Sequence, residues 1–227
     1  MTLTAQVTAC PPGRRRLAGR GRPATAAVLT AAAVLAAVSC STSSTPGRPV
    51  TAGSAHAPLA TARPAPAAAL ARPLPRARPN RLQIPMIGVD TALIDLGLER
   101  DGTLQVPPDG TRAGWFTGAP SPGERGPAVI TGHVDWAGHQ GVFYDLRRLK
   151  AGAPITIVRQ DGSTAVFIVT GTQQVPKGTF PTRAVYGDVN HPALRLITCG
   201  GSFDHTAHSY RDNIVVYADL LTTRTST

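Results

Sequence analysis

The sequence predicts a mostly β domain over residues 81–223, a barrel or sandwich of mainly antiparallel strands, preceded by a disordered N-terminal tail. Three observations support this prediction. Short runs of β-branched and aliphatic residues are separated by turns rich in Gly, Pro and Asp. No segment carries a helical period long enough for more than one or two short helices. Residues 1–80 lack the aromatic residues and the charge balance of a packed domain.

The expected strands follow from the apolar runs and from the turn residues between them. Asp161-Gly162, which separates two such runs, is a strong hairpin signal. Asp101-Gly102 marks another turn, ahead of Leu104–Val106, and only Val142–Leu149 has the pattern of a short helix. The runs that predict strands are Ala128–Thr131, Ile155–Val158, Val166–Val169, Leu194–Thr198 and Ile214–Tyr217.

The formal charge of +10 is confined to the tail. Residues 1–80 contain ten arginines, no acidic residue and 11 of the 21 prolines. The remaining residues, 81–227, therefore hold 13 of the 23 basic side chains and all 13 acidic ones, and their net charge is zero. A neutral domain offers no surface for a polyanion, so the composition argues against nucleic-acid binding.

Residues 1–39 have the pattern of an export signal or membrane anchor. Five arginines between Arg14 and Arg22 precede the uncharged, alanine-rich run Ala24–Ser39, which is shorter than the ~20 residues that span a bilayer comfortably. A buried helix would suit the length but not the flanking arginines. Cleavage after Ser39, lipidation of Cys40 and an uncleaved anchor all remain open, and tethering to the outer membrane face is favoured over release.

Residues 40–80 are expected to be a Pro/Ala-rich disordered linker, and residues 224–227 a short tail. Proline-rich chains favour extended conformations of ~3.1 Å per residue, so this linker could reach on the order of 100 Å. Such a spacer would lift the domain from a membrane into a surrounding wall.

Three residues that could perform chemistry stand at the ends of expected strands. Cys199 follows Leu194–Thr198, His133 follows the run that ends at Gly132, and Arg211 precedes the last strand. A thiolate can attack a carbonyl to give a thioacyl intermediate, and an imidazole can pass the proton to the departing amine. A guanidinium can stabilise the oxyanion. Together these groups suit acyl transfer.

Each residue taken alone also has a plain structural explanation. Cys199 is the only cysteine of residues 81–227, so no disulfide can form within the domain, and a lone cysteine in a β domain is often a small core residue. His133 fits a turn, and Arg211 fits the exposed face of a strand. Asp135 could orient the imidazole or lie in solvent, and Trp115 and Trp136 could flank a groove or close the barrel.

Three blocks in order resemble the signatures of sortases. They are Thr131-Gly132-His133-Val134-Asp135, then Leu196-Ile197-Thr198-Cys199-Gly200-Gly201, then Tyr210-Arg211-Asp212-Asn213. The Cys-Gly-Gly ending, the Tyr-Arg-Asp-Asn block and the opening Arg81–Pro85 are most similar to class F sortases. The resemblance covers essentially all of residues 81–221.

The resemblance implies a closed sortase-type β-barrel and a membrane-associated cysteine transpeptidase. Such an enzyme cuts a C-terminal sorting signal similar to Leu-Pro-any-Thr-Gly between Thr and Gly, and transfers the acyl group to an amine of a cell-wall precursor or pilin. It implies Cys199 as nucleophile, His133 as general acid/base, Arg211 as oxyanion or motif contact, and Thr198 as a substrate contact. The implied location is the extracytoplasmic membrane face of a Gram-positive-type cell.

No cofactor is expected from the sequence. In some sortases acidic residues of the loop that corresponds to Pro176–Pro192 help to bind calcium, but here that loop has only Asp188, so no metal is expected. Asp204, His205 and His208 could at most form a weak metal site.

Three rival functions are distinguishable from the sequence. An L,D-transpeptidase usually has Arg two residues after a Ser-His-Gly-Cys setting, whereas Cys199 is followed by Gly200-Gly201. Papain-like wall peptidases place Cys before His, the reverse of the order here. A non-catalytic exported barrel with an inert cysteine is the third, and a reactive thiol would exclude it.

Overall fold

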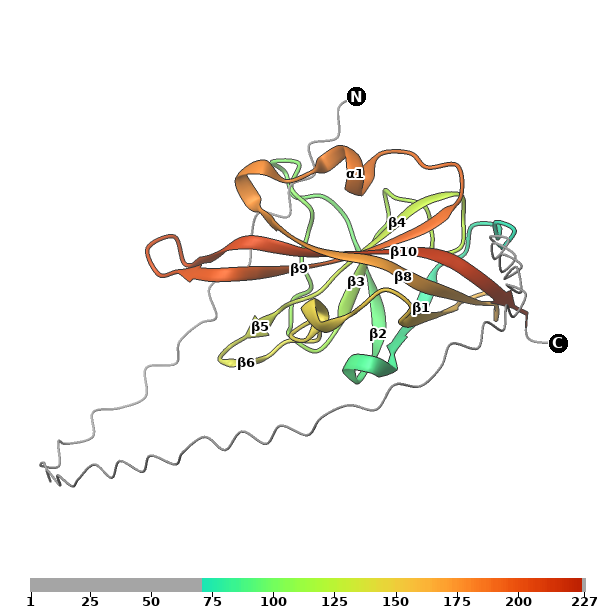
Figure 1. Ribbon diagram of the computed structural model, residues 1–227, viewed down its shortest axis with the longest axis horizontal. Helices are drawn as coiled ribbons and strands as arrows, with labels where there is room; N and C mark the ends of the chain where they lie inside the picture. Colours follow the sequence, from blue (N-terminus) through green and yellow to red (C-terminus); the bar gives the residue numbers. More distant parts are fainter. Residues whose placement is uncertain (1–70, 226–227) are drawn as a thin grey trace, which may run out of the picture. The chain divides into compact units, whose positions relative to one another are not determined.

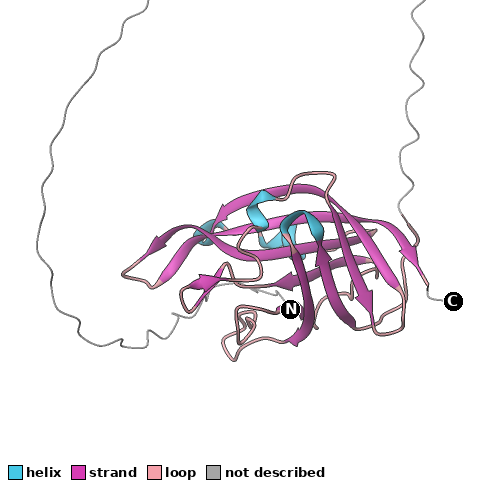
Figure 2. Cartoon of the chain, turned by 90° about the horizontal axis from the view of Figure 1, so that it is seen from below, coloured by secondary structure: helices cyan, strands magenta, loops and turns pink. Residues whose placement is uncertain are grey.

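The structure, a computed structural model, describes residues 71–225. Eight strands close into a barrel in the order β1-β2-β3-β4-β9-β10-β8-β7, and β5 and β6 form a separate two-stranded sheet (Figure 1). The few helices are single turns at the outside of the sheet (Figure 2). The prediction of a mostly β, closed barrel is confirmed. The predicted export segment and residues 40–70 of the predicted linker lie outside the described residues.

Many strands and helices begin or end near Gly and Pro residues of the sequence. The barrel strands are β1 (Pro79–Ile84), β2 (Val89–Leu96), β3 (Ala113–Phe116), β4 (Gly126–Thr131), β7 (Pro154–Arg159), β8 (Thr164–Pro176), β9 (Pro192–Asp204) and β10 (Ser209–Arg224). The remaining elements are η1 (Pro85–Ile87), β5 (Asp135–Trp136), β6 (His139–Gln140), η2 (Leu146–Arg148), η3 (Lys177–Thr179) and α1 (Thr182–Tyr186).

All five predicted strands exist, as parts of β4 and of β7 to β10. Gly162 has a φ of 78°, which the predicted β7–β8 turn requires. β1 to β3 were not predicted as strands. In β2 the buried residues Val89, Thr91 and Leu93 alternate with exposed ones, so period-two alternation could have identified it. β3 is only four residues long and buried on both faces, and no alternation marks it.

One detail of the prediction was wrong. Val142–Leu149 forms only the 3-10 turn η2, and its apolar residues Phe143, Leu146 and Leu149 are all buried in the barrel core rather than lining one face of a longer helix. The prediction of mainly antiparallel strands is confirmed, although the pairs β2–β3 and β4–β9 run parallel. The sixty residues between β4 and β9 are long enough for the crossover that a parallel pair requires.

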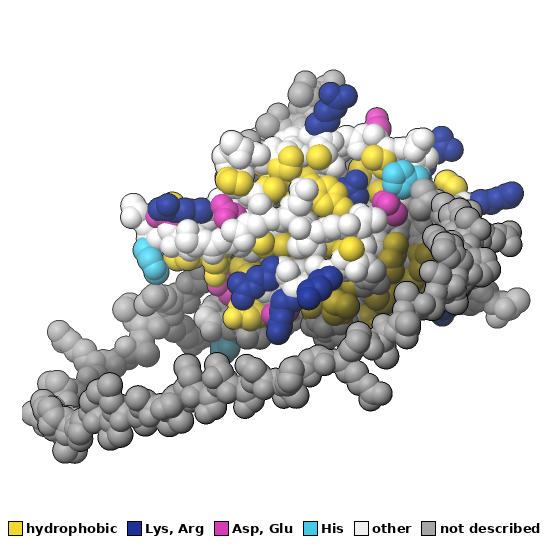
Figure 3. Space-filling model, viewed as in Figure 1, with side chains coloured by type: hydrophobic (Ala, Val, Ile, Leu, Met, Phe, Trp, Pro, Cys, Tyr) yellow, Lys and Arg dark blue, Asp and Glu magenta, His cyan; other side chains and the backbone are white. Residues whose placement is uncertain are grey.

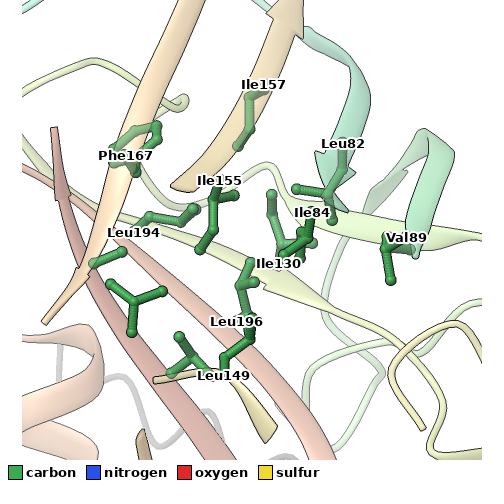
Figure 4. Packing of buried hydrophobic residues seen from close by; sticks show 14 of the residues in the cluster. Leu82, Ile84, Val89, Ile130, Leu149, Ile155, Ile157, Phe167, Leu194 and Leu196 are labelled. Carbon is green, nitrogen blue, oxygen red and sulfur yellow. The ribbon is translucent and has the colours of Figure 1, made fainter. Parts of the chain in front are cut away.

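The core of the barrel is formed by the inward side chains of its strands (Figure 4). The labelled residues of Figure 4 that are 0% exposed include Ile130, Ile155 and Leu196, from β4, β7 and β9. Full burial of such a side chain contributes about 1.5–3 kcal/mol. A second cluster lies on the outer face, where Val185 of α1 packs with residues of β4, β9 and β10. β4 and β9 are therefore held from both sides, and their ends are rigid supports for a site.

The described residues before β1 contact the barrel. Leu74 N donates a hydrogen bond to Gly123 O at 2.8 Å, and the buried Arg159 donates one to Pro75 O. Pro79 is already paired with Arg159 of β7. The predicted domain boundary at residue 81 falls inside β1, because this strand begins at Pro79. The buried Arg159 guanidinium takes its hydrogen-bond acceptor from the segment before the strand.

Within the described residues, no helix combines the length and apolar character needed to cross a membrane.

Candidate active site

Cys199 lies in β9, directly opposite Asn213 of β10. Its side chain is 2% exposed and takes part in a disulfide in this structure, so acyl transfer would require its reduced form. Gly201, two residues later, has a φ of 75°, and a Cβ there would lie 2.3 Å from the Asp212 Oδ2 atom. The sequence Cys-Gly-Gly thus lets the backbone beside the sulfur turn where no larger residue fits.

The parallel pairing of β4 and β9 brings His133 towards Cys199. Thr131 is paired with Ile197, and Gly132 N donates a hydrogen bond to Ile197 O at 3.2 Å. The two strands run in the same direction, so two further positions lead from Thr131 to His133, just beyond the end of β4, and from Ile197 to Cys199, within β9. The topology therefore brings two residues that are 66 apart in the chain towards each other, but Cys199 does not end its strand as the sequence analysis expects.

The imidazole of His133 is held by two contacts. Its Nε2 atom lies 2.8 Å from Pro107 O, and its ring centroid lies 4.7 Å from that of Trp136 at an interplanar angle of 45°. A carbonyl oxygen only accepts, so the hydrogen bond places a proton on Nε2. This leaves Nδ1 as the nitrogen that can exchange a proton. Trp136 therefore packs against the histidine, a contact that is neither of the two roles expected for it.

The loop that carries Pro107 is braced by an ion pair. Asp109 accepts hydrogen bonds from Arg112 Nε at 2.8 Å and Nη2 at 2.6 Å, and from Thr111. The Arg112 guanidinium, helped by Thr111, holds the pKa of the Asp109 carboxyl far below its usual range. The adjacent Gly110 packs against Trp136 and accepts the Val142 N–H. The brace therefore supports both groups that hold His133.

We expect Asp109→Asn to lower the free energy of unfolding at pH 7 by about 0.5–1 kcal/mol, the range for a well-formed exposed pair. The pKa of this carboxyl is lower in the folded state, so its contribution is present above pH ~4, the unfolded pKa, and is lost as pH falls towards the folded value. Denaturant unfolding at several pH values checks this. The difference in unfolding free energy between wild type and Asp109→Asn should narrow below pH ~4. The control Asp188→Asn, at an exposed acid, should leave the stability unchanged. A gap independent of pH would contradict the role of the brace.

Arg211 is placed differently from the other two predicted residues. It lies at an irregularity in the β9–β10 pairing, between Tyr210 and Asp212, and its side chain is 66% exposed. Its Nη2 atom donates a hydrogen bond to Asp204 Oδ2 at 3.2 Å. Figure 3 shows charged side chains of both signs gathered at the tip of this hairpin. The guanidinium is thus held at the tip by Asp204 and does not line the pocket beside Cys199.

A pocket of about 500 Å³ opens beside Cys199. Thr198 lines it too, and the Thr198 hydroxyl oxygen is buried with no hydrogen-bond partner within residues 71–225. A buried hydroxyl without a partner costs about 1–3 kcal/mol, which a polar group of a ligand would recover. Other residues that line the pocket are Val134, Tyr144, Arg147, Gln174, Tyr210 and Ile214.

Tyr210 and Asp135 connect the pocket wall to the histidine loop. The Tyr210 hydroxyl donates a hydrogen bond to Asp135 Oδ2. Burial, together with this hydrogen bond, raises the pKa of Tyr210 to about 12, so the phenol stays neutral and keeps donating at physiological pH. Asp135 is therefore neither a free turn acid nor a partner of the imidazole, but an anchor for Tyr210.

Three residues of the site were missed by the sequence analysis. Asn213, opposite Cys199, is 1% exposed and its side-chain oxygen has no hydrogen-bond partner among the described residues. Counting back from the hairpin turn could have found it. Pro107 and Arg147 had no such signal, because Pro107 reaches the site through a loop and Arg147 through the short η2, and only the fold places these segments.

Within residues 71–225, no group of three or more His, Cys, Asp and Glu side chains could hold a metal ion. Asp204 of the predicted weak site is engaged with Arg211 and with the backbone N–H groups of Thr206 and Ala207.

Residues 82–221 match the model of the sortase domain family. The chain therefore belongs to the sortase family and is a cysteine transpeptidase that acts on sorting signals. Among solved structures, sortase A from Listeria monocytogenes is 16% identical with a TM-score of 0.50, the match covering 66% of this chain and 92% of that one. The SrtA sortase from Actinomyces oris is 20% identical with a TM-score of 0.50, covering 69% and 87%. These likenesses support the fold alone. A search of curated proteins finds no match.

Proposed function

We propose that this sortase cleaves a C-terminal signal similar to Leu-Pro-any-Thr-Gly between Thr and Gly, through a thioacyl intermediate on Cys199. The observation that carries the proposal is the parallel β4–β9 pair, which brings His133 towards Cys199, a residue that lines a pocket. The acyl group then passes to an amine of a cell-wall precursor or pilin.

The proposed roles follow from the chemistry of the groups. The Cys199 thiolate attacks the Thr carbonyl carbon, and the C–S bond forms as the C–N bond to Gly breaks. His133 gives its proton from Nδ1 to the departing amine, while the Nε2–H bond to Pro107 O fixes the ring. The incoming amine later loses a proton to His133, forms the new amide bond and releases the sulfur. Thr198 is proposed as a substrate contact, because its buried hydroxyl lacks a partner in the described chain.

Arg211 is proposed to stabilise the oxyanion, which requires its guanidinium to leave Asp204. The Arg211 side chain is long and exposed, and an exposed ion pair of this kind contributes only ~0–1 kcal/mol. Exchanging Asp204 for the substrate would therefore cost little free energy. The planar fork of the guanidinium can then donate two hydrogen bonds to the substrate.

We expect Arg211→Lys to lose most of the activity, by about 10²-fold in kcat/KM, although the charge is kept. The ammonium cannot reproduce the two parallel donors of the guanidinium. Steady-state cleavage of a fluorogenic sorting peptide measures the effect. Arg183→Lys, an exposed arginine of α1, is the matched control and should behave as wild type. Unchanged kinetics in Arg211→Lys would remove this residue from the mechanism.

We further propose that the enzyme is of class F and works at the extracytoplasmic membrane face, anchored by its N-terminal segment. The class F assignment rests on Cys199-Gly200-Gly201, on Tyr210-Arg211-Asp212-Asn213 and on Arg81–Pro85. The location rests on the arginine-rich segment followed by the apolar run Ala24–Ser39. A lipid on Cys40 or release from the membrane are the alternatives that fractionation of the native cells would identify.

The test of the activity is product analysis of the reduced protein with a library of sorting peptides and an amine acceptor. We expect one peptide product ending in Thr and a second in which the acceptor amine replaces Gly. If no peptide is cut by protein whose fold is verified, the proposed substrate class is wrong.

A further inference from the structure

The pocket beside Cys199 has one ionised lining side chain, Arg147. This arginine lies in η2, is exposed, and makes no ion pair within the described part of the chain. Its neighbour Arg148, in contrast, is paired with Asp145 at 3.3 Å. Figure 3 shows basic side chains gathered over the region of η2 on this face. The pocket is therefore lined by Cys199 and, among the described residues, by one positively charged side chain.

The acids near the pocket are already engaged and do not line it. Asp135 accepts the Tyr210 hydroxyl, and Asp212 accepts the Gln174 side-chain amide at 2.6 Å. Each acid thus accepts a hydrogen bond from a neutral residue that lines the pocket, Tyr210 or Gln174. The charge presented to a ligand is that of Arg147.

Two polar groups among the residues that line the pocket differ in what they can bind. The Thr198 hydroxyl oxygen, one residue before Cys199, is buried and has no hydrogen-bond partner among residues 71–225. A hydroxyl oxygen accepts a hydrogen bond, and an amine can donate one. The Arg147 guanidinium matches a carboxylate, with which it forms two parallel hydrogen bonds.

We propose that this pocket binds the acyl acceptor, and that the acceptor is an amine that carries a carboxylate, as a free amino acid or the C-terminal end of a short peptide does. The inference rests on the proposed function, because it names the class of molecule that resolves the thioacyl intermediate. The carboxylate binds Arg147, and the amine nitrogen lies at Thr198 and Cys199.

The chemical step is the second half of the transfer. The neutral amine attacks the thioacyl carbon, the C–N bond forms, and the C–S bond breaks as Cys199 leaves. One amine proton passes through His133 to the sulfur, so the products are the new amide and the free thiol. The incoming amine approaches along the path by which the first amine departed. The contribution of Arg147 is to bind the acceptor.

The test measures how the thioacyl enzyme is divided between aminolysis and hydrolysis. Reduced protein and one sorting peptide are mixed with glycine, diglycine or triglycine, and in parallel with the amide of each, which lacks the carboxylate. Mass spectrometry gives the ratio of ligated to hydrolysed product. For wild type we expect the ratio to be about fivefold higher with the free acid than with the amide for at least one length.

Arg147→Met removes the charge and retains most of the side-chain length, and should abolish this preference. Arg148→Met is the matched control and should keep it, while Arg147→Lys should keep part. No preference in wild type at any length, or the same preference in Arg147→Met, would overturn the inference while leaving cleavage intact. A change in thioacyl formation without a change in the ratio would assign the pocket to the sorting peptide instead. Absence of any thioacyl enzyme would refute the proposed function itself.

Discussion

Replacement of Cys199 by Ala is expected to abolish both cleavage and transfer of a sorting peptide, by about 10⁴-fold or more. The thioacyl intermediate cannot form without the sulfur, and no other cysteine lies in residues 71–225 to replace it. The residue is buried within β9, but the substitution removes only one heavy atom, so the change in unfolding free energy should be about 1 kcal/mol.

Cleavage of a quenched fluorescent peptide, followed by product analysis, measures the loss under reducing conditions. Circular dichroism of the variant should match that of reduced wild type, which separates loss of chemistry from loss of fold. Turnover by Cys199→Ala at the wild-type rate would show that another group performs the reaction.

Replacement of His133 by Ala should lower kcat/KM by about 10²–10⁴-fold, the usual contribution of a general acid/base. In the proposed mechanism the imidazole passes the proton to the departing amine and assists the cysteine as nucleophile. The substitution also leaves the Pro107 carbonyl without its hydrogen-bond donor, so some loss of stability should accompany the kinetic effect.

Two measurements separate these contributions. The rate of alkylation of Cys199 by iodoacetamide at neutral pH should fall in His133→Ala, which a purely structural effect would not produce. His139→Ala, at an exposed histidine of β6, should retain both the alkylation rate and the activity. If His133→Ala is alkylated as fast as wild type and still cuts the peptide, the imidazole has no part in the mechanism.

The strands that sequence analysis found are those whose apolar residues form uninterrupted runs. Ala128–Thr131 and Leu194–Thr198 are buried on both faces in β4 and β9, and continuous apolar runs are the pattern of such strands. Their parallel pairing was not evident, because it depends on which distant segments meet, and local residue patterns do not encode that. The pairing is also what brings His133 towards Cys199, so before the fold was known the two residues could be grouped only by their resemblance to sortase motifs.

The residue types in the sequence indicated the chemistry of the site, but they did not indicate the environment of each side chain. The Cys-Gly-Gly turn is explained by the positive φ of Gly201, and by Asp212, which lies too close to Gly201 for a larger residue to fit. The positions of Asp135 and Arg211 were not predictable, since each depends on one hydrogen bond across the chain, to Tyr210 and to Asp204. Arg147 was not found because nothing in the local sequence distinguishes it from Arg148.

The central claim is that Cys199 carries the acyl group of a cut sorting signal. Intact-protein mass spectrometry of the reduced protein, quenched in acid within seconds of adding a sorting peptide, tests it most directly. We predict a mass increase equal to the peptide segment up to Thr, mapped by digestion to Cys199 and removed by hydroxylamine. Unmodified Cys199 during active turnover, or an adduct on any other residue, would contradict the claim.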